Sequence, residues 1–159
     1  MTEPLEIERK FLVDQKIWQP GEQGISVRQG YLAGEGPLLV RIRQQDRKAF
    51  LTLKGRTTGI SRLEFEYEIP MVDAVGLLRL CQQPLVEKVR YVEEFEGHTW
   101  EIDRFFGSNE GLMIAEIELT SEDESFARPA WLGREVSGDS RYYNSNLIQH
   151  PYSEWKDGA

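Results

Sequence analysis

Charged and apolar residues alternate along several short stretches of this chain. Such a period of two is typical of a β-strand, whose successive side chains point to opposite faces. The first stretch, EIERKFL, places Glu6, Glu8 and Lys10 on one face of a strand, opposite Ile7 and Phe11. The predicted strands are Leu5–Val13, Ser26–Leu32, Leu38–Gln44, Ala49–Lys54, Arg62–Ile69, Val86–Glu94, His98–Phe105 and Leu112–Leu119.

Helical patterns interrupt the strands at three places. A helix is expected from Asp73, as its cap, to about Gln83. The sequence SEDE, which begins at Ser121, has the form of a capping box and predicts a short helix. A last helix is expected to start at a cap on Asp139 and to run through Ile148.

Short turns join most of the strands, including the glycine-rich stretch Gly34–Pro37. No repeat, low-complexity tract or shift in composition marks a boundary, so residues 1–159 are expected to form a single domain. Many strands with few helices predict a mainly β fold of the α+β kind, an antiparallel barrel with helices packed outside.

The polar face of the predicted strands is nearly pure charge, and each strand tends to one sign. On one strand, alternating Glu or Lys usually marks an ordinary solvated face, and an open sheet with this face in water is the alternative. Over seven strands the pattern favours closure, because like charges along a strand repel unless opposite charges lie across from them. A barrel would turn these charges inward. Burying them costs several kcal/mol each without partners, metal or water, so such a lumen implies a function.

The charged faces supply two kinds of candidate site residue. The basic ones are Lys10, Arg41, Arg43, Lys54, Lys88 and Arg90. The acidic ones are Glu6, Glu8, Glu64, Glu66, Glu68, Glu101, Asp103, Glu116 and Glu118. Arg and Lys bind phosphate oxygens, whereas clustered carboxylates hold Mg²⁺ or Mn²⁺ that bridge to substrate phosphates. Together they predict a metal–polyphosphate site.

Composition narrows the class of protein. The 159 residues are 40% hydrophobic and 29% charged, which predicts a soluble globular protein without a membrane segment. The net charge of −8 argues against a nucleic-acid partner. Cys81 is the single cysteine, so a reducing cytoplasm is expected. Only His98 and His150 are available, which excludes a His/Cys zinc cluster.

Taken in order, the charged strands resemble the triphosphate tunnel metalloenzymes, also called CYTH-domain proteins. The likeness runs through ExExK at Glu6–Lys10, R-x-R at Arg41 and Arg43, Lys54 of LTLKG, ExExE at Glu64–Glu68, K-x-R at Lys88 and Arg90, E-x-D at Glu101 and Asp103, and E-x-E at Glu116 and Glu118. It implies an eight-stranded antiparallel tunnel that hydrolyses or cyclises triphosphates with Mg²⁺ or Mn²⁺. The segment DSRYYNSNLI resembles the C-terminal helix that plugs one end of the tunnel in short members.

The resemblance also implies roles for individual residues. Lys10, Arg41, Arg43, Lys54, Lys88 and Arg90 would grip the triphosphate, and Lys88 would also serve catalysis. The leading metal ligands would be Glu6, Glu8, Glu116 and Glu118; Glu64, Glu66, Glu68, Glu101 and Asp103 would assist by ligation, through metal-bound water, or by orienting the basic residues. Glu6 or Glu8 would help to activate the attacking water. Tyr31 of RQGYL matches a tyrosine regarded as a proton acceptor, with aromatic packing near a tunnel mouth as the equal alternative.

The chain is more similar to the short, single-domain bacterial members than to thiamine triphosphatases or class IV adenylyl cyclases. Inorganic tripolyphosphate is therefore the expected substrate, with pyrophosphate and phosphate as products. Hydrolysis of ATP or thiamine triphosphate, cyclisation of ATP, and a non-catalytic metal–polyphosphate-binding module are the alternatives. The expected partner is thus a small-molecule triphosphate, and the formation of a homodimer stays open.

Overall fold

The computed structural model of the protein describes residues 3–32 and 37–155, so that the predicted turn Gly34–Pro37 lies, except for Pro37, outside the described residues. The strands are β1 (Leu5–Val13), β2 (Ile25–Tyr31), β3 (Leu39–Gln45), β4 (Lys48–Lys54), β5 (Ser61–Ile69), β6 (Val86–Phe95), β7 (His98–Phe105), β8 (Met113–Glu118) and β9 (Leu132–Glu135). The α-helices are α1 (Met71–Leu80) and α2 (Asn144–Gln149), and short 3-10 helices are η1 (Gly107–Asn109), η2 (Ser140–Tyr142) and η3 (Tyr152–Glu154).

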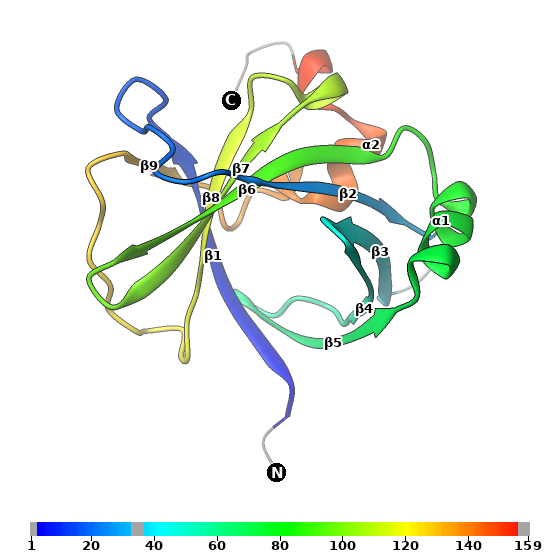
Figure 1. The fold of residues 1–159 in the computed structure, drawn as a ribbon. Helices are drawn as coiled ribbons and strands as arrows, with labels where there is room; N and C mark the ends of the chain where they lie inside the picture. The colour runs from blue at the N-terminus through cyan, green and yellow to red at the C-terminus, as the bar shows by residue number, and fades with distance from the viewer. Residues whose placement is uncertain (1–2, 33–36, 156–159) are drawn as a thin grey trace.

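Eight of these strands close into an antiparallel barrel. Their order is β5-β4-β3-β2-β6-β7-β8-β1, and β1 returns to β5 through the pairs Leu5↔Leu63 to Ile7↔Ser61. The second half of β1 leaves β5 and pairs with β9, which lies outside the closed ring (Figure 1). The predicted closed antiparallel barrel is confirmed.

The charged faces of the strands point into the barrel. Lys88 and Asp103 are 2% and 0% exposed, which an open sheet with this face in water would not allow. The open-sheet alternative is therefore wrong. The predicted outward-facing positions are Ile7, Phe11, Ile42, Leu53, Phe65, Val89, Ile102 and Ile117, and each alternates along its strand with a residue of the inner face.

Helices cover less of the barrel than the sequence predicts. Helix α1 packs Ala74 and Leu78 against Ile42 of β3. Over β1, β7 and β8 the cover comes from irregular segments, which contribute Trp18 and Trp131 to the apolar core there. Three outward side chains of β5 stay partly in solvent: Leu63, Phe65 and Tyr67. The expectation of mainly helical cover is wrong because large aromatic side chains on loops bury enough apolar surface to replace it.

The first two predicted helices differ in the structure. The first begins after Pro70, whose φ is −58°, and Asp73 lies within its first turn and not at its cap. The SEDE segment forms no helix. Instead, Glu124 accepts hydrogen bonds from the Thr120 backbone N–H (2.7 Å) and hydroxyl (2.6 Å), so the capping interaction closes a turn.

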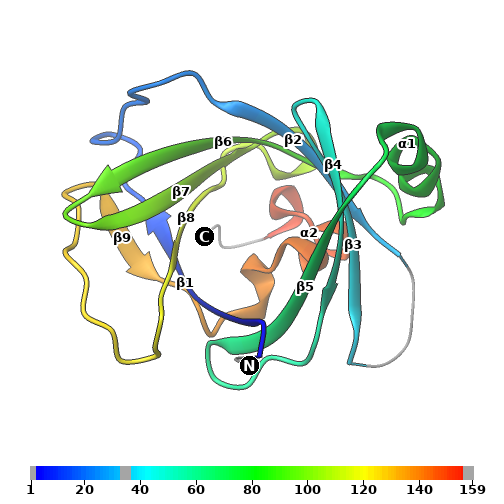
Figure 2. The same cartoon turned by 60° about the horizontal axis from the view of Figure 1, so that its bottom comes forward.

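The C-terminal segment closes one end of the barrel. Inward-facing apolar side chains at that end cluster with the last helices: Tyr31, Val86, Phe105, Ile114, Tyr142, Leu147 and Ile148. Asp139 does cap this region, but it caps η2 by accepting from the Arg141 backbone N–H, and α2 starts only at Asn144. Figure 2 looks into the barrel and shows α2 inside the ring of strands. The described helices include none with the length and apolarity needed to span a bilayer.

Because the outer surface of the barrel is covered unevenly, replacing two outward phenylalanines by alanine should lower the free energy of unfolding by unequal amounts. Phe11 is fully buried and contacts the Trp100 ring edge-on at 5.7 Å, so Phe11→Ala should lower the free energy of unfolding by about 3–5 kcal/mol. Phe65, on the same outer surface, is 40% exposed, and Phe65→Ala should cost at most about 1 kcal/mol. Denaturant titrations of the two variants compare them. Equal losses of unfolding free energy in the two variants would contradict the conclusion that Phe11 is covered and Phe65 is not.

Candidate active site

The barrel encloses a polar cavity of about 290 Å³. Among the described residues, its basic lining side chains are Lys10, Arg41, Arg43, Lys54, Arg62, Lys88 and Arg90. The acidic ones are Glu6, Glu8, Glu64, Glu66, Glu101, Glu116 and Glu118. These charges balance one another, although the whole chain carries −8. The cavity thus concentrates basic residues in an otherwise acidic protein.

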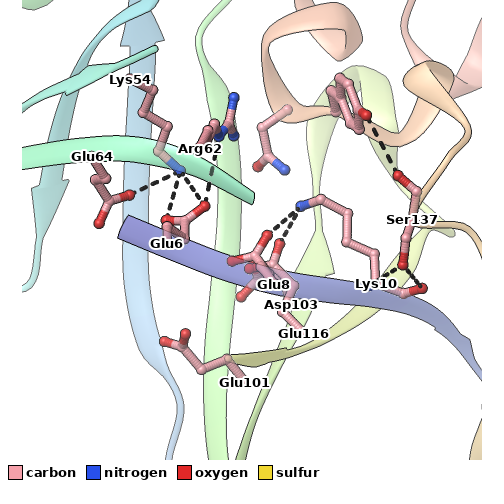
Figure 3. A network of polar contacts seen from close by, with 12 residues as sticks. Glu6, Glu8, Lys10, Lys54, Arg62, Glu64, Glu101, Asp103, Glu116 and Ser137 are labelled. Atoms are coloured by element: carbon pink, nitrogen blue, oxygen red, sulfur yellow. Dashed lines mark hydrogen bonds and ion pairs between the residues drawn. The ribbon is translucent and has the colours of Figure 1, made fainter. Parts of the chain in front are cut away.

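Lys54 is the centre of one ion-pair group in the cavity (Figure 3). Its Nζ lies 3.2 Å from both carboxylate oxygens of Glu6 and 3.0 Å from Glu64 Oε2. Arg62 adds a weaker contact, with its Nε 3.7 Å from Glu6 Oε1. Burial raises the pKa of Glu6 above its ordinary value. Arg62 is absent from the predicted site because it precedes the ExExE run, although it shares that strand face.

Lys10 is the centre of a second group. Its Nζ lies 2.6 Å from Glu116 Oε1 and 3.3 Å from Glu8 Oε1 (Figure 3). Burial by itself would lower the pKa of Lys10, but the charges of the two carboxylates hold this pKa above its ordinary value. Glu8 has the opposite balance, because burial and the charge of Glu116 raise its pKa to about 7.

Four carboxylates meet on the neighbouring strands β1, β7 and β8. Glu8 lies directly across from Glu118, and Glu101 lies across from Glu116. Burial and the charges of Glu6 and Glu101 raise the pKa of Glu118. Like charges in directly opposite positions destabilise a sheet, so this array fits a cation between its members.

The chemistry of this donor set suits a hard divalent cation such as Mg²⁺ or Mn²⁺, since every donor is a carboxylate oxygen. In the part of the chain that the structure describes, no three acidic, imidazole or thiol groups are gathered into a metal-binding cluster. In Figure 3, Glu6, Glu8 and Glu116 are turned toward lysines. Holding a metal would therefore require the lysines to exchange these carboxylates for other anions.

Asp103 lies behind the cavity wall and not in it. It is fully buried, and its two oxygens accept hydrogen bonds from Arg90 Nε (2.8 Å) and Nη2 (2.9 Å). Its Oδ2 also lies 2.8 Å from Lys88 Nζ. Although burial opposes ionisation, the charges of Arg90 and Lys88 hold the pKa of Asp103 at about 2. This geometry orients two basic residues, which is one of the roles expected from the sequence.

Positive charge is in excess around Arg43. Within the described residues, no carboxylate lies at ion-pair distance from its guanidinium, and its Nε donates to Gln29 Oε1 at 3.2 Å. Burial and the charges of Arg41 and Arg90 lower the pKa of Arg43 to about 10. The Nε of Arg41 is buried and has no hydrogen-bond partner among the described residues. Buried donors left unpaired are costly, so this region is suited to a bound polyanion.

The sequence profile of the CYTH domain matches residues 4–152. The chain belongs to the CYTH domain family. It is 51% identical over 153 residues to an inorganic triphosphatase of Acetivibrio thermocellus, covering 96% of this chain and 98% of the relative. A second inorganic triphosphatase, from Nitrosomonas europaea, is 40% identical over 147 residues, covering 89% and 95%. A crystal structure of an inorganic triphosphatase superposes with a TM-score of 0.65 at 37% identity, covering 89% of this chain and 96% of that one.

Membership of the CYTH family confirms the identification made from the ordered charged strands. Every basic residue predicted for the site lines the cavity, as do all the predicted carboxylates except Asp103, which lies behind it, and Glu68, which is exposed. Tyr31 lines the cavity and also packs in the apolar cluster that closes the barrel, so the structure contains the contacts for both roles considered for it.

Two uncharged residues of this CYTH domain were missed as site residues. Gln29 is 1% exposed, and its Nε2 donates to the Tyr31 hydroxyl at 2.8 Å and to Asn144 Oδ1 at 3.3 Å. Asn144 Oδ1 also accepts from Lys88 Nζ at 2.8 Å. Gln29 could have been found from its place two residues before Tyr31 on one strand face. The signal for Asn144 is that it belongs to the segment DSRYYNSNLI, which resembles the helix that plugs the tunnel.

Proposed function

We propose that this CYTH domain hydrolyses inorganic tripolyphosphate to pyrophosphate and phosphate in a reaction that depends on Mg²⁺ or Mn²⁺. The observation that carries the proposal is the buried positive charge around Arg43, which has no carboxylate at ion-pair distance among the described residues, in a cavity that carboxylates also line. The two relatives named inorganic triphosphatase, similar over nearly the whole chain, support the same substrate.

The basic residues would bind the phosphate chain. Arg41 and Arg43 from β3 and Lys88 from β6 line the same cavity. Each charge-assisted hydrogen bond contributes about 1.5–3 kcal/mol, so several of them give the triphosphate most of its binding energy and leave little for a nucleoside. These contacts also strengthen as negative charge shifts in the transition state, and they therefore accelerate the reaction as well as bind the substrate.

The carboxylates of β1 and β8 would hold the metal, with Glu6, Glu8, Glu116 and Glu118 as the leading ligands and Glu64 and Glu66 of β5 as further oxygen donors. A bound divalent cation neutralises phosphate charge and makes water more acidic. Glu8 or Glu6, which line the cavity beside these donors, would help to activate the attacking water. Tyr31 is a further candidate for the base.

The proposal is tested by measuring phosphate and pyrophosphate released from tripolyphosphate with Mg²⁺, with Mn²⁺ and with excess chelator. We expect equal amounts of the two products with metal and no turnover with chelator. Full activity in chelator would contradict the metal requirement. Tight binding of tripolyphosphate without turnover would instead identify a metal–polyphosphate-binding module.

A further inference from the structure

We propose that Gln29 and Asn144 are positioning residues whose amide groups aim Arg43 and Lys88 at the triphosphate without cancelling their charges. The inference rests on the proposed function of the cavity and assigns a task to two uncharged side chains within it. Neither residue is a ligand of the reacting atoms in this scheme. Both act through the cations that they hold.

The two amides form one connected, buried network. Lys88 Nζ donates to Asn144 Oδ1 at 2.8 Å, and Arg43 Nε donates to Gln29 Oε1 at 3.2 Å. Gln29 Nε2 joins the halves by donating to Asn144 Oδ1 at 3.3 Å. Asn144 is 8% exposed and Gln29 is 1% exposed, so both amides are removed from bulk water.

The orientation of both amides follows from their partners. Lys and Arg side chains donate hydrogen bonds and cannot accept them, so the amide oxygens of Asn144 and Gln29 must face Lys88 and Arg43. The Gln29 nitrogen then faces the Tyr31 hydroxyl and Asn144 Oδ1, which both accept. No other orientation satisfies these contacts, which gives each cation a single acceptor direction from the network.

Arg43 and Lys88 contact fewer carboxylates than three other cations of the cavity do. Lys10, Lys54 and Arg90 each contact two or more carboxylates. Arg43 has its amide contact and no carboxylate at ion-pair distance within the described residues, and Lys88 shares Asp103 with Arg90. An amide oxygen fixes the direction of a donor while leaving its unit charge in place. The charge of Arg43 remains available to a polyanion, whereas Lys88 also pairs with the Asp103 carboxylate at 2.8 Å.

Asn144 comes from the segment that closes the barrel. It is the first residue of α2, whose Leu147 and Ile148 pack in the apolar cluster at that end. Packing of α2 therefore sets the position of Asn144 Oδ1 and, through it, the direction of Lys88. The closing segment thus contributes to the substrate site as well as to the core.

The test compares two substitutions at Asn144 by steady-state kinetics with tripolyphosphate and saturating Mg²⁺ or Mn²⁺. Asn144→Asp keeps the shape but gives Lys88 a second carboxylate beside Asp103, and should raise KM at least about tenfold by offsetting the remaining positive charge. Asn144→Ala keeps the charge but removes the acceptor, and should lower kcat about tenfold or more with KM changed less than about threefold. A purely structural asparagine would not divide its effects between KM and kcat in this way.

Gln149→Glu provides the control, because it adds the same charge to the exposed end of α2 and should leave both constants unchanged. Gln29→Glu places a carboxylate beside Arg43 and should also raise KM for tripolyphosphate. It tests the positioning role by itself if Asn144→Asp does not fold. If wild type hydrolyses tripolyphosphate and both acidic variants keep its KM, the positioning role is overturned and the proposed function stands. If wild type neither hydrolyses nor binds tripolyphosphate, the proposed function is overturned, and the positioning role with it.

Discussion

Replacement of Asp103 by asparagine is expected to lower the free energy of unfolding by about 3–5 kcal/mol at pH 7. Asp103 is fully buried, accepts two hydrogen bonds from Arg90, and lies 2.8 Å from Lys88 Nζ. Asparagine has nearly the same shape but no charge, so two buried cations would lose their shared carboxylate. Denaturant titration of the metal-free proteins measures the loss.

The free energy of unfolding that Asp103→Asn loses should decrease at low pH. In the folded protein the pKa of Asp103 is about 2, below its ordinary value of 3.8. Its ionised form therefore stabilises the fold above about pH 4, and this contribution fades as the pH falls toward 2. The difference between wild type and Asp103→Asn should narrow over that range. Glu101→Gln is the control, because Glu101 also pairs with Arg90 but its side chain is 38% exposed, so that it should cost at most about 1 kcal/mol. A loss for Asp103→Asn no larger than that of the control would contradict its role.

Glu8→Gln is expected to reduce tripolyphosphate hydrolysis on the order of 10²–10³-fold while the metal-free protein becomes no less stable. Glu8 lies across from Glu118, and burial together with the charge of Glu116 raises its pKa to about 7. Because the folded-state pKa is raised, ionisation of Glu8 removes stability as the pH rises from about 4.5 to 7. Glutamine avoids that cost, so the variant should equal or exceed wild type in stability at pH 8.

Added metal should make wild type more stable than the Glu8→Gln variant. Metal that binds only the folded state raises the melting temperature by mass action, and the Glu8→Gln variant should lose most of that rise. Glu68→Gln is the matched control, because Glu68 is exposed and does not line the cavity. Activity of Glu8→Gln within tenfold of wild type, together with a normal metal-induced rise, would make Glu8 a structural partner of Lys10 only.

The strands of this protein could be predicted because charge and apolar character alternate so strictly along them. β1 and β7 were predicted with their observed bounds, and the repulsion of like charges along each strand correctly favoured closure. The cover could not be predicted, since Trp18 and Trp131 lie in segments without periodicity. β9 was missed because its four residues are too few to show a period of two. One of them is Gly133, a residue that strand patterns do not favour, and it is needed because an added Cβ would lie 2.8 Å from the Leu12 carbonyl oxygen.

The sequence predicted which residues belong to the site better than it predicted which of them pair with one another. Alternation places Glu101 and Asp103 on one inner face, but their depths differ by two residues, or about 7 Å along the strand. Glu101 is therefore half-exposed and lines the cavity, whereas Asp103 is buried behind Arg90. The partnership of Lys10 with Glu116 depends on the register between β1 and β8. Asn144 depends on how α2 enters the barrel, which no strand pattern contains.

The side-by-side comparison of kcat/KM for tripolyphosphate and ATP at equal metal concentration is the most direct test of a cavity built to grip the phosphate chain. We predict a higher value for tripolyphosphate, because the binding groups of the cavity are overwhelmingly charged and a nucleoside adds few contacts. Faster conversion of ATP, with cyclic AMP among the products, would contradict the proposed function and identify a cyclase.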